Sequence, residues 1–394
     1  MIGNKAHIKS INILGIISNF TLACLSVFIF SIFSAHAMCA RLFEKKLQDN
    51  NPKDPLFHEK FVSLRELSYH DWGEGVYQSR FKVSPSGKPS NGNAIEEREI
   101  FVYLPDQYFE EPERNYRVLY VLDGQNAFND PYCGMGDHEG WQLNLLTAAL
   151  SNHKIIEPII IVAIKHGISR MAEDLPPPHP KSMGLDLINY IINDIKLSLI
   201  DKVLRTRPEA KNTAILGSSL AALIPFLAHM EYSHIFGLSG VFSPSFWLLA
   251  LPEDMKDLAL QDKKKEIEDY FGDKLKEEDA KRMFSYIKEP EQLNARLYIY
   301  VGGVQNPDPE KEADFSDGNY FSSKMVAELR NQAWGNDGYL IDKWVPGALH
   351  DEEHWNKAAD GFIRIFSPGP NVNATFRHPH IKKRPQRNTH INVQ

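Results

Sequence analysis

The chain has 394 residues, of which 43% are hydrophobic and 24% are charged, with 24 glycines and 24 prolines. These fractions exclude a disordered, collagen-like or coiled-coil protein and indicate a folded chain of enzyme size. The net charge of −7 gives no general attraction for nucleic acid or for an anionic membrane surface. Length alone suggests two or three domains.

The first 37 residues have the pattern of a secretory signal. Lys5 and Lys9 precede an uncharged apolar run, 11–33, and the small-x-small sequence Ala35-His36-Ala37 follows it. A basic start, an apolar centre and such an end predict a signal peptide over residues 1–37, which places the folded part in the periplasm or outside the cell. The run is also long enough to span a bilayer, so a retained membrane anchor is the alternative.

The sequence contains three cysteines, Cys24, Cys39 and Cys133. Removal of the signal would leave the last two, which an oxidising compartment would allow to pair. Two unrelated free thiols are the alternative. The spacing of Cys and His residues matches no metal site.

The remaining chain shows the pattern of an α/β protein. Residues 38–56 are polar and indicate a linker, whereas 76–83 and 98–104 alternate like two antiparallel strands. After residue 104, short apolar runs alternate with longer helical stretches, which predicts a mostly parallel sheet covered on both faces. Strands are expected at 117–122, 158–164, 213–216, 235–242, 296–301 and 339–345, and helices at 140–150, 185–204, 220–230 and 322–332.

Two further segments stand apart from this alternation. Residues 251–294 are dense in charged side chains and predict a helical insertion, either a surface excursion or a lid. Residues 367–394 are basic with few apolar positions, which predicts a disordered tail. One catalytic domain, 57–366, therefore accounts for most of the length.

A candidate nucleophile lies after the strand predicted at 213–216. Gly217-Ser218-Ser219-Leu220-Ala221 is nearly the pattern G-x-S-x-G, between a strand and a helix. That pattern lifts the serine above the sheet in a sharp turn, which needs small residues two before and two after it. Gly217 meets this need, while Ala221 departs from it by one methyl. An ordinary helix N-cap is the other interpretation of Ser219.

A nucleophilic serine needs a general base, and in these folds the chain order is serine, acid, histidine. His350 directly follows the last predicted strand, where the base is expected. His354 is four residues further along and falls on the following helix, so His350 is the better candidate.

Four stretches together resemble the esterase family of α/β-hydrolases that includes enterochelin esterases, S-formylglutathione hydrolases, feruloyl esterases and mycolyltransferases. The stretches are 118–126, 192–207 leading into 217–221, 236–247 with its Ser243-Pro-Ser-Phe-Trp, and 347–355. The resemblance covers about residues 60–366 and implies an α/β-hydrolase fold that needs no metal or organic cofactor.

By this resemblance Ser219 is the nucleophile and His350 the general base. The family's oxyanion hole would be formed by the backbone N–H groups of Leu220 and Gln125. Such donors suit the task because they are fixed before charge develops on the carbonyl oxygen. Asp123 is interpreted as a turn residue.

The acid departs from the family pattern. Its common placement, a few residues after the strand 296–301, falls on Gln305, which cannot carry a negative charge. Asp308, three residues further along as in the mycolyltransferase branch, is the predicted acid. Glu310 and Asp317 are the alternatives.

The sequence therefore predicts a secreted or periplasmic serine carboxylesterase that cleaves a small-molecule ester through an acyl-enzyme. An acyltransferase with the same triad is one alternative. A non-catalytic binding protein on a decayed hydrolase scaffold is the other, suggested by Ala221 and Gln305. A membrane would be a partner only if the N-terminal segment were retained, and nucleic acid is not expected.

Overall fold

The computed structural model describes residues 55–63, 75–79, 81–88, 94–128, 140–261, 264–271, 275–289, 294–305, 319–332, 334 and 338–376. Several sequence predictions lie outside these ranges. They are the signal segment 1–37, nearly all of the linker 38–56, a Cys39–Cys133 pair, and the candidate acids Asp308, Glu310 and Asp317.

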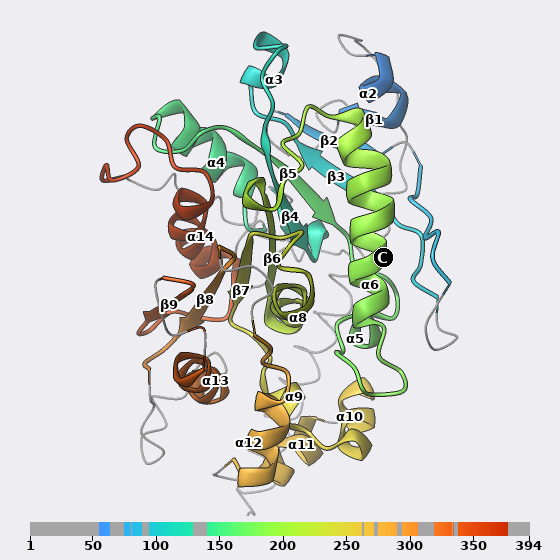
Figure 1. Ribbon diagram of the computed structural model, residues 1–394, viewed down its shortest axis with the longest axis vertical. Helices are drawn as coiled ribbons and strands as arrows, with labels where there is room; N and C mark the ends of the chain where they lie inside the picture. The colour runs from blue at the N-terminus through green and yellow to red at the C-terminus, as the bar shows by residue number, and fades with distance from the viewer. Residues whose placement is uncertain are drawn as a thin grey trace, which may run out of the picture. The chain divides into compact units, whose positions relative to one another are not determined.

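A mixed sheet runs through the described part of the chain in the strand order β1-β2-β3-β5-β4-β6-β7-β8-β9 (Figure 1). The strands are β1 (Phe61–Ser63), β2 (Val76–Ser79), β3 (Ile100–Tyr103), β4 (Arg117–Leu122), β5 (Ile159–Ile164), β6 (Thr213–Ser218), β7 (Leu238–Phe242), β8 (Arg296–Gly302) and β9 (Leu340–Val345). Strands β4 to β9 are parallel, and β1 to β3 form an antiparallel edge. The predicted mostly parallel sheet is confirmed.

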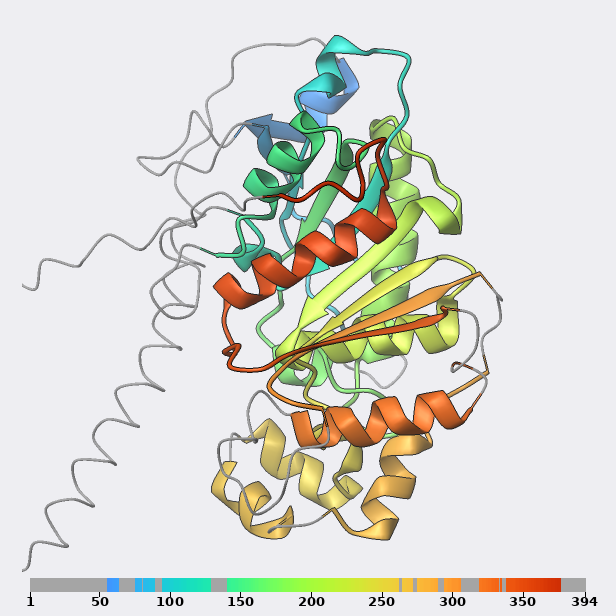
Figure 2. The ribbon, with the colours of Figure 1, turned by 90° about the vertical axis from the view of Figure 1, so that its left-hand side faces the viewer.

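The central strands are buried on both faces, because helices cover the sheet on each side. Every residue of β5 and β6 is buried, which explains why these segments are continuous apolar runs rather than alternating ones. Helices α4 and α14 lie on one face, and α6, α8 and α13 lie on the other (Figures 1 and 2). Their bounds are α4 (Leu143–Asn152), α6 (Gly184–Tyr190), α8 (Leu223–Tyr232), α13 (Asn319–Asn331) and α14 (Glu352–Phe366).

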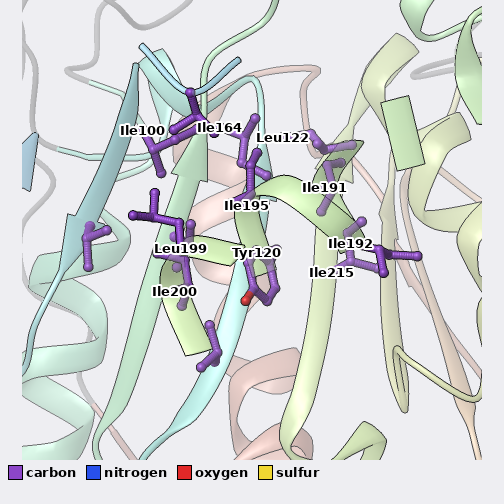
Figure 3. Packing of buried hydrophobic residues seen from close by; sticks show 14 of the residues in the cluster. Ile100, Tyr120, Leu122, Ile164, Ile191, Ile192, Ile195, Leu199, Ile200 and Ile215 are labelled. Atoms are coloured by element: carbon purple, nitrogen blue, oxygen red, sulfur yellow. The ribbon is translucent and has the colours of Figure 1, made fainter. Parts of the chain in front are cut away.

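The helix α6 continues without a break through a π-helical segment, Ile191–Ile200, into α7 (Asp201–Val203). This long helix packs isoleucines and leucines onto Tyr120 and Leu122 of β4 and Ile215 of β6 (Figure 3). Burying one such side chain stabilises the fold by about 1.5–3 kcal/mol. The cluster fixes the sheet beneath the turns described below.

Three charged helices occupy the predicted insertion between β7 and β8. They are α10 (Glu253–Leu260), α11 (Lys264–Phe271) and α12 (Glu277–Phe284), preceded by the short α9 (Trp247–Ala250). Their apolar residues, including Ile267 and Met283, join the core around α8 and α13. No helix in the described ranges combines the length and the apolar character required to cross a membrane.

The structure differs from the predicted tail at its start. Residues 367–376 lie along the connection between α4 and β5, where Pro368 forms a bridge with Ile156 and Gly369 N–H donates to the Ile155 carbonyl at 2.9 Å. Arg364 of α14 donates to the Val372 carbonyl at 2.6 Å. These ten residues therefore belong with the folded domain.

His229 in α8 makes stability depend on pH. Its ring is fully buried against Trp334, and among the described residues neither ring nitrogen has a hydrogen-bond partner. Burial lowers the pKa of His229 from 6.5 to about 3. Between these values the unfolded chain binds a proton that the folded protein does not, so stability falls as pH falls through this window.

We expect wild type to lose about 2 kcal/mol of unfolding free energy through His229 between pH 7 and pH 5. His229→Phe keeps a ring of similar size and should show a loss smaller by that amount in urea titrations at both pH values. Parallel pH dependences for the two proteins would contradict this assignment.

Candidate active site

A sharp turn joins β6 to the short helix η4 (Ser219–Ala222). Ser219 has φ +58°, the left-handed backbone that costs a non-glycine residue about 1–2 kcal/mol. Ser218 is extended, with φ −125°, and buried, whereas Ser219 is half-buried among buried neighbours. The structure thus separates the two adjacent serines, because only Ser219 lies on the strained turn and reaches the surface.

The turn explains the small residues on either side of Ser219. A Cβ at position 217 would lie 2.5 Å from the Ala221 carbonyl oxygen, so that position requires glycine. Ala221 is buried in the core, and it is its carbonyl that approaches Gly217. The departure from the second glycine of the motif is accommodated.

The two predicted oxyanion donors belong to turns after neighbouring strands. Leu220 is in the first turn of η4, and Gln125 is in the short helix η1 (Gly124–Asn126) after β4. Strands β4 and β6 are paired and parallel, so both turns lie at the same edge of the sheet. N–H groups in a first helical turn lack intrahelical acceptors, which leaves them available to a ligand oxygen.

The turn after β7 connects the serine turn to the histidine segment. Ser243 also has a left-handed backbone, with φ +46°, and its N–H donates to the Tyr300 carbonyl at 2.7 Å. Ser245 N–H donates to the Ser219 carbonyl at 3.1 Å. Trp355 of α14 donates its Nε1–H to Ser243 Oγ at 2.9 Å. The turn after β7 therefore contacts both the Ser219 turn and Trp355 of α14.

His350 is exposed in the segment between β9 and α14. Its ring meets Trp355 edge to face, with centroids 5.0 Å apart. His354 is used differently, because its backbone N–H and its Nδ1 both contact the helix-capping Asp351, at 3.0 and 2.7 Å. The position of His354 on the helix matches the prediction.

Sequence reasoning missed a second connection, between α14 and the segment that follows β4. Asn126 Nδ2 donates to the buried Glu352 at 3.5 Å, and Asn356 Nδ2 donates to the Trp141 carbonyl at 2.6 Å. Trp141 N–H donates to the Asn126 carbonyl at 2.6 Å. The Asn126–Glu352 and Asn356–Trp141 pairs are each more than 200 residues apart along the chain, so no local signal indicates them.

A buried group of charges borders the turn after β4. Asp123, with φ +50°, contacts Arg170 in the short helix α5 (Arg170–Glu173), at 2.5 Å between Oδ2 and Nη2. Beside it, Arg98 and Glu173 form a nearly fully buried bidentate pair with a closest distance of 2.7 Å. Burial raises the pKa of Asp174 well above its usual range.

The acid of the predicted triad remains a prediction. Gln305 is exposed after β8, and Asp308 belongs to the segment 306–318, outside the described residues. Within the described ranges, no cluster of three or more His, Cys, Asp or Glu side chains forms a candidate metal site.

A parallel sheet in this order, with a serine turn after β6 and a histidine after the last strand, has the α/β-hydrolase architecture. Residues 93–358, more than half of the chain, match the family model described as "Putative esterase". The chain belongs to this family.

Comparisons with individual proteins give low identities. The chain is 25% identical over 159 residues to the uncharacterized protein YbbA of Bacillus subtilis (strain 168), covering 38% of this chain and 58% of YbbA. Among solved structures, the BES protein from Bacillus cereus has 15% identity and a TM-score of 0.46. The match covers 82% of this chain and 99% of the BES protein. The siderophore hydrolase EstB from Aspergillus nidulans has 17% identity and a TM-score of 0.48, covering 75% and 96%.

Trp355→Phe would remove the hydrogen bond to Ser243 while keeping an aromatic ring beside His350. If the bond orients the base, turnover of an ester should fall about tenfold, because small misplacements of a catalytic group are costly. Trp334→Phe is the matched control. Trp334 is likewise buried and donates its Nε1–H, in this case to the Lys288 carbonyl at 2.9 Å. Both variants should lose about 1 kcal/mol of stability. Equal activity in the two would contradict the role of Trp355.

Proposed function

We propose that this protein is a serine carboxylic ester hydrolase that acts on a small-molecule ester outside the cytoplasm. The observation that carries the proposal is the strained, half-buried Ser219 turn beside the Gln125 turn at the same sheet edge. Membership of an esterase family supports the same chemistry. The N-terminal pattern over residues 1–37 supports export.

In the proposed reaction His350 removes the Ser219 hydroxyl proton as Oγ attacks the ester carbonyl carbon. The N–H groups of Leu220 and Gln125 stabilise the negative oxygen of the tetrahedral intermediate. The intermediate collapses, the carbon–oxygen bond to the alcohol breaks, and His350 gives the proton to that alcohol. A water deprotonated by His350 then attacks the acyl carbon, the bond from that carbon to Ser219 Oγ breaks, and His350 returns the proton to Oγ as the acid leaves.

Asp308 is proposed to hold His350 in the tautomer that accepts the serine proton. The proposal follows from Gln305, which stands at the family's usual acid position and has no charge to offer. A carboxylate three residues later is the first in the chain after Gln305 that can supply it.

Ser219→Ala should lower turnover of p-nitrophenyl acetate by about a thousandfold or more, because the nucleophile is lost. Ser218→Ala is the matched control, since Ser218 is adjacent, buried and on extended backbone. The control should keep turnover and labelling by a fluorophosphonate probe. Full activity in Ser219→Ala would overturn the proposal, and failure of wild type to label would favour a binding protein. Transfer of the acyl group to an added alcohol in preference to water would favour an acyltransferase.

Asp308→Asn should lower kcat by about a hundredfold or more, because an amide cannot stabilise the protonated imidazole. Glu310→Gln and Asp317→Asn test the alternatives under the same assay. A large loss in either of these, with wild-type turnover in Asp308→Asn, would move the acid to that residue.

A further inference from the structure

The carboxylate of Asp123 is held from the segment after β5. Arg170 contacts it with two nitrogens: Nη2 lies 2.5 Å from Oδ2, and Nε lies 3.1 Å from Oδ1 and 3.2 Å from Oδ2. Arg170 also lies 3.6 Å from Asp174. Although partial burial lowers the pKa of Arg170, the Asp123 carboxylate contributes most to raising it above its already high value, so Arg170 stays charged. A planar guanidinium that engages both oxygens fixes the orientation of the carboxylate as well as its position.

Asp123 in turn determines where the following N–H groups point. Its left-handed backbone begins the η1 turn, and its carbonyl accepts the Asn126 N–H at 2.9 Å. Gly124, the next residue, packs tightly against β5, since a Cβ at this position would lie 2.3 Å from the Ile164 nitrogen. The backbone at Gly124 therefore cannot move toward β5 to absorb a shift of Asp123. A shift of Asp123 would therefore be passed on to Gln125.

The Gln125 side chain ties the same two segments together. Its Nε2 is 3.5 Å from Asp123 Oδ1, and its Oε1 accepts the His166 backbone N–H at 3.3 Å. The side chain is buried, so this amide belongs to the support of the turn. The backbone N–H of Gln125 remains as the group for the oxyanion.

We propose that Arg170 is a positioning residue of the oxyanion hole, which acts through Asp123 to fix the direction of the Gln125 backbone N–H. The inference rests on the proposed hydrolase function and adds a residue that its chemistry does not require by itself. Arg170 is proposed to act through Asp123, which makes it a positioning residue rather than a catalytic one.

The anchoring of this segment does not depend on Arg170. Glu173 is held by Arg98 through two contacts and accepts the Gly167 N–H at 3.0 Å. Glu96 accepts the Ile168 N–H at 2.8 Å. Removal of Arg170 should leave these bonds in place, so its effect on the η1 turn can be isolated.

The test compares Arg170→Met with Glu96→Ala, which removes a bond of the same segment that does not reach Asp123. Each full-length protein is assayed for kcat and KM on p-nitrophenyl acetate. Hydrogen exchange of the Asn126 and Ala127 amides, which close the η1 turn, is measured in parallel. In Arg170→Met we expect kcat to fall about tenfold to a hundredfold, KM to change less than about threefold and these amides to exchange about tenfold faster. Glu96→Ala should match wild type in all three.

Arg170→Lys keeps the charge but cannot engage both carboxylate oxygens in one plane, and it should give an intermediate kcat. This variant also serves if Arg170→Met does not fold. Wild-type kcat and wild-type exchange in the arginine variants would overturn the inference. A raised KM with unchanged kcat would also overturn it, by making Arg170 a substrate contact. If Arg170→Met exchanges faster but wild type hydrolyses no ester, the link from Arg170 through Asp123 to the η1 turn would be supported and the proposed function contradicted. The two failures are therefore distinguishable.

Discussion

Three parallel strands that lie side by side, β4, β6 and β7, are each followed directly by a non-glycine residue with left-handed backbone. These residues are Asp123, Ser219 and Ser243, three of the five non-glycine residues with positive φ in the described ranges. Each such conformation costs about 1–2 kcal/mol and persists only where the surroundings enforce it. Because the carboxyl ends of parallel strands share one edge, the three turns are brought together there.

Two of the three turns are bonded to each other, and the third is held by the segment after β5. Ser243 N–H is bound by the Tyr300 carbonyl of β8, and Ser245 N–H binds the Ser219 carbonyl. Asp123 is held by Arg170 from the segment after β5. The strain at each turn is thus opposed by a bond from a neighbouring strand, turn or helix. The isoleucine-rich core beneath β4 and β6 supplies the free energy that keeps those strands in place.

The sequence predicted the parts of this arrangement that depend on local pattern. Apolar runs gave the strands β4 to β9, and glycine two residues before Ser219 gave the turn, because steric demands of a sharp turn act within a few residues. The short β1 was missed, since three residues show no alternation. Contacts such as Arg170 with Asp123, 47 residues apart, depend on which strands become neighbours and leave no mark in composition. The folded structure of residues 367–376 was missed for the same reason. Backbone bonds to residues 154–156, which are distant along the chain, hold this segment in place.

A triad acid usually performs two tasks: it places the histidine ring, and it stabilises the charge and tautomer of that ring. In the proposed site, the contacts of the turn after β7 take over the first of these tasks. Trp355 is held by Ser243 and packs on His350, while Ser245 of the same turn holds the Ser219 carbonyl. The Ser219 turn and the His350 segment are therefore connected through the turn after β7. In the proposed mechanism, an acid that follows Gln305 along the chain has to stabilise charge and select the tautomer of His350 rather than place the ring by itself. Under the proposed function, this division accounts for a glutamine at position 305 in a chain whose Ser219 turn keeps its left-handed backbone.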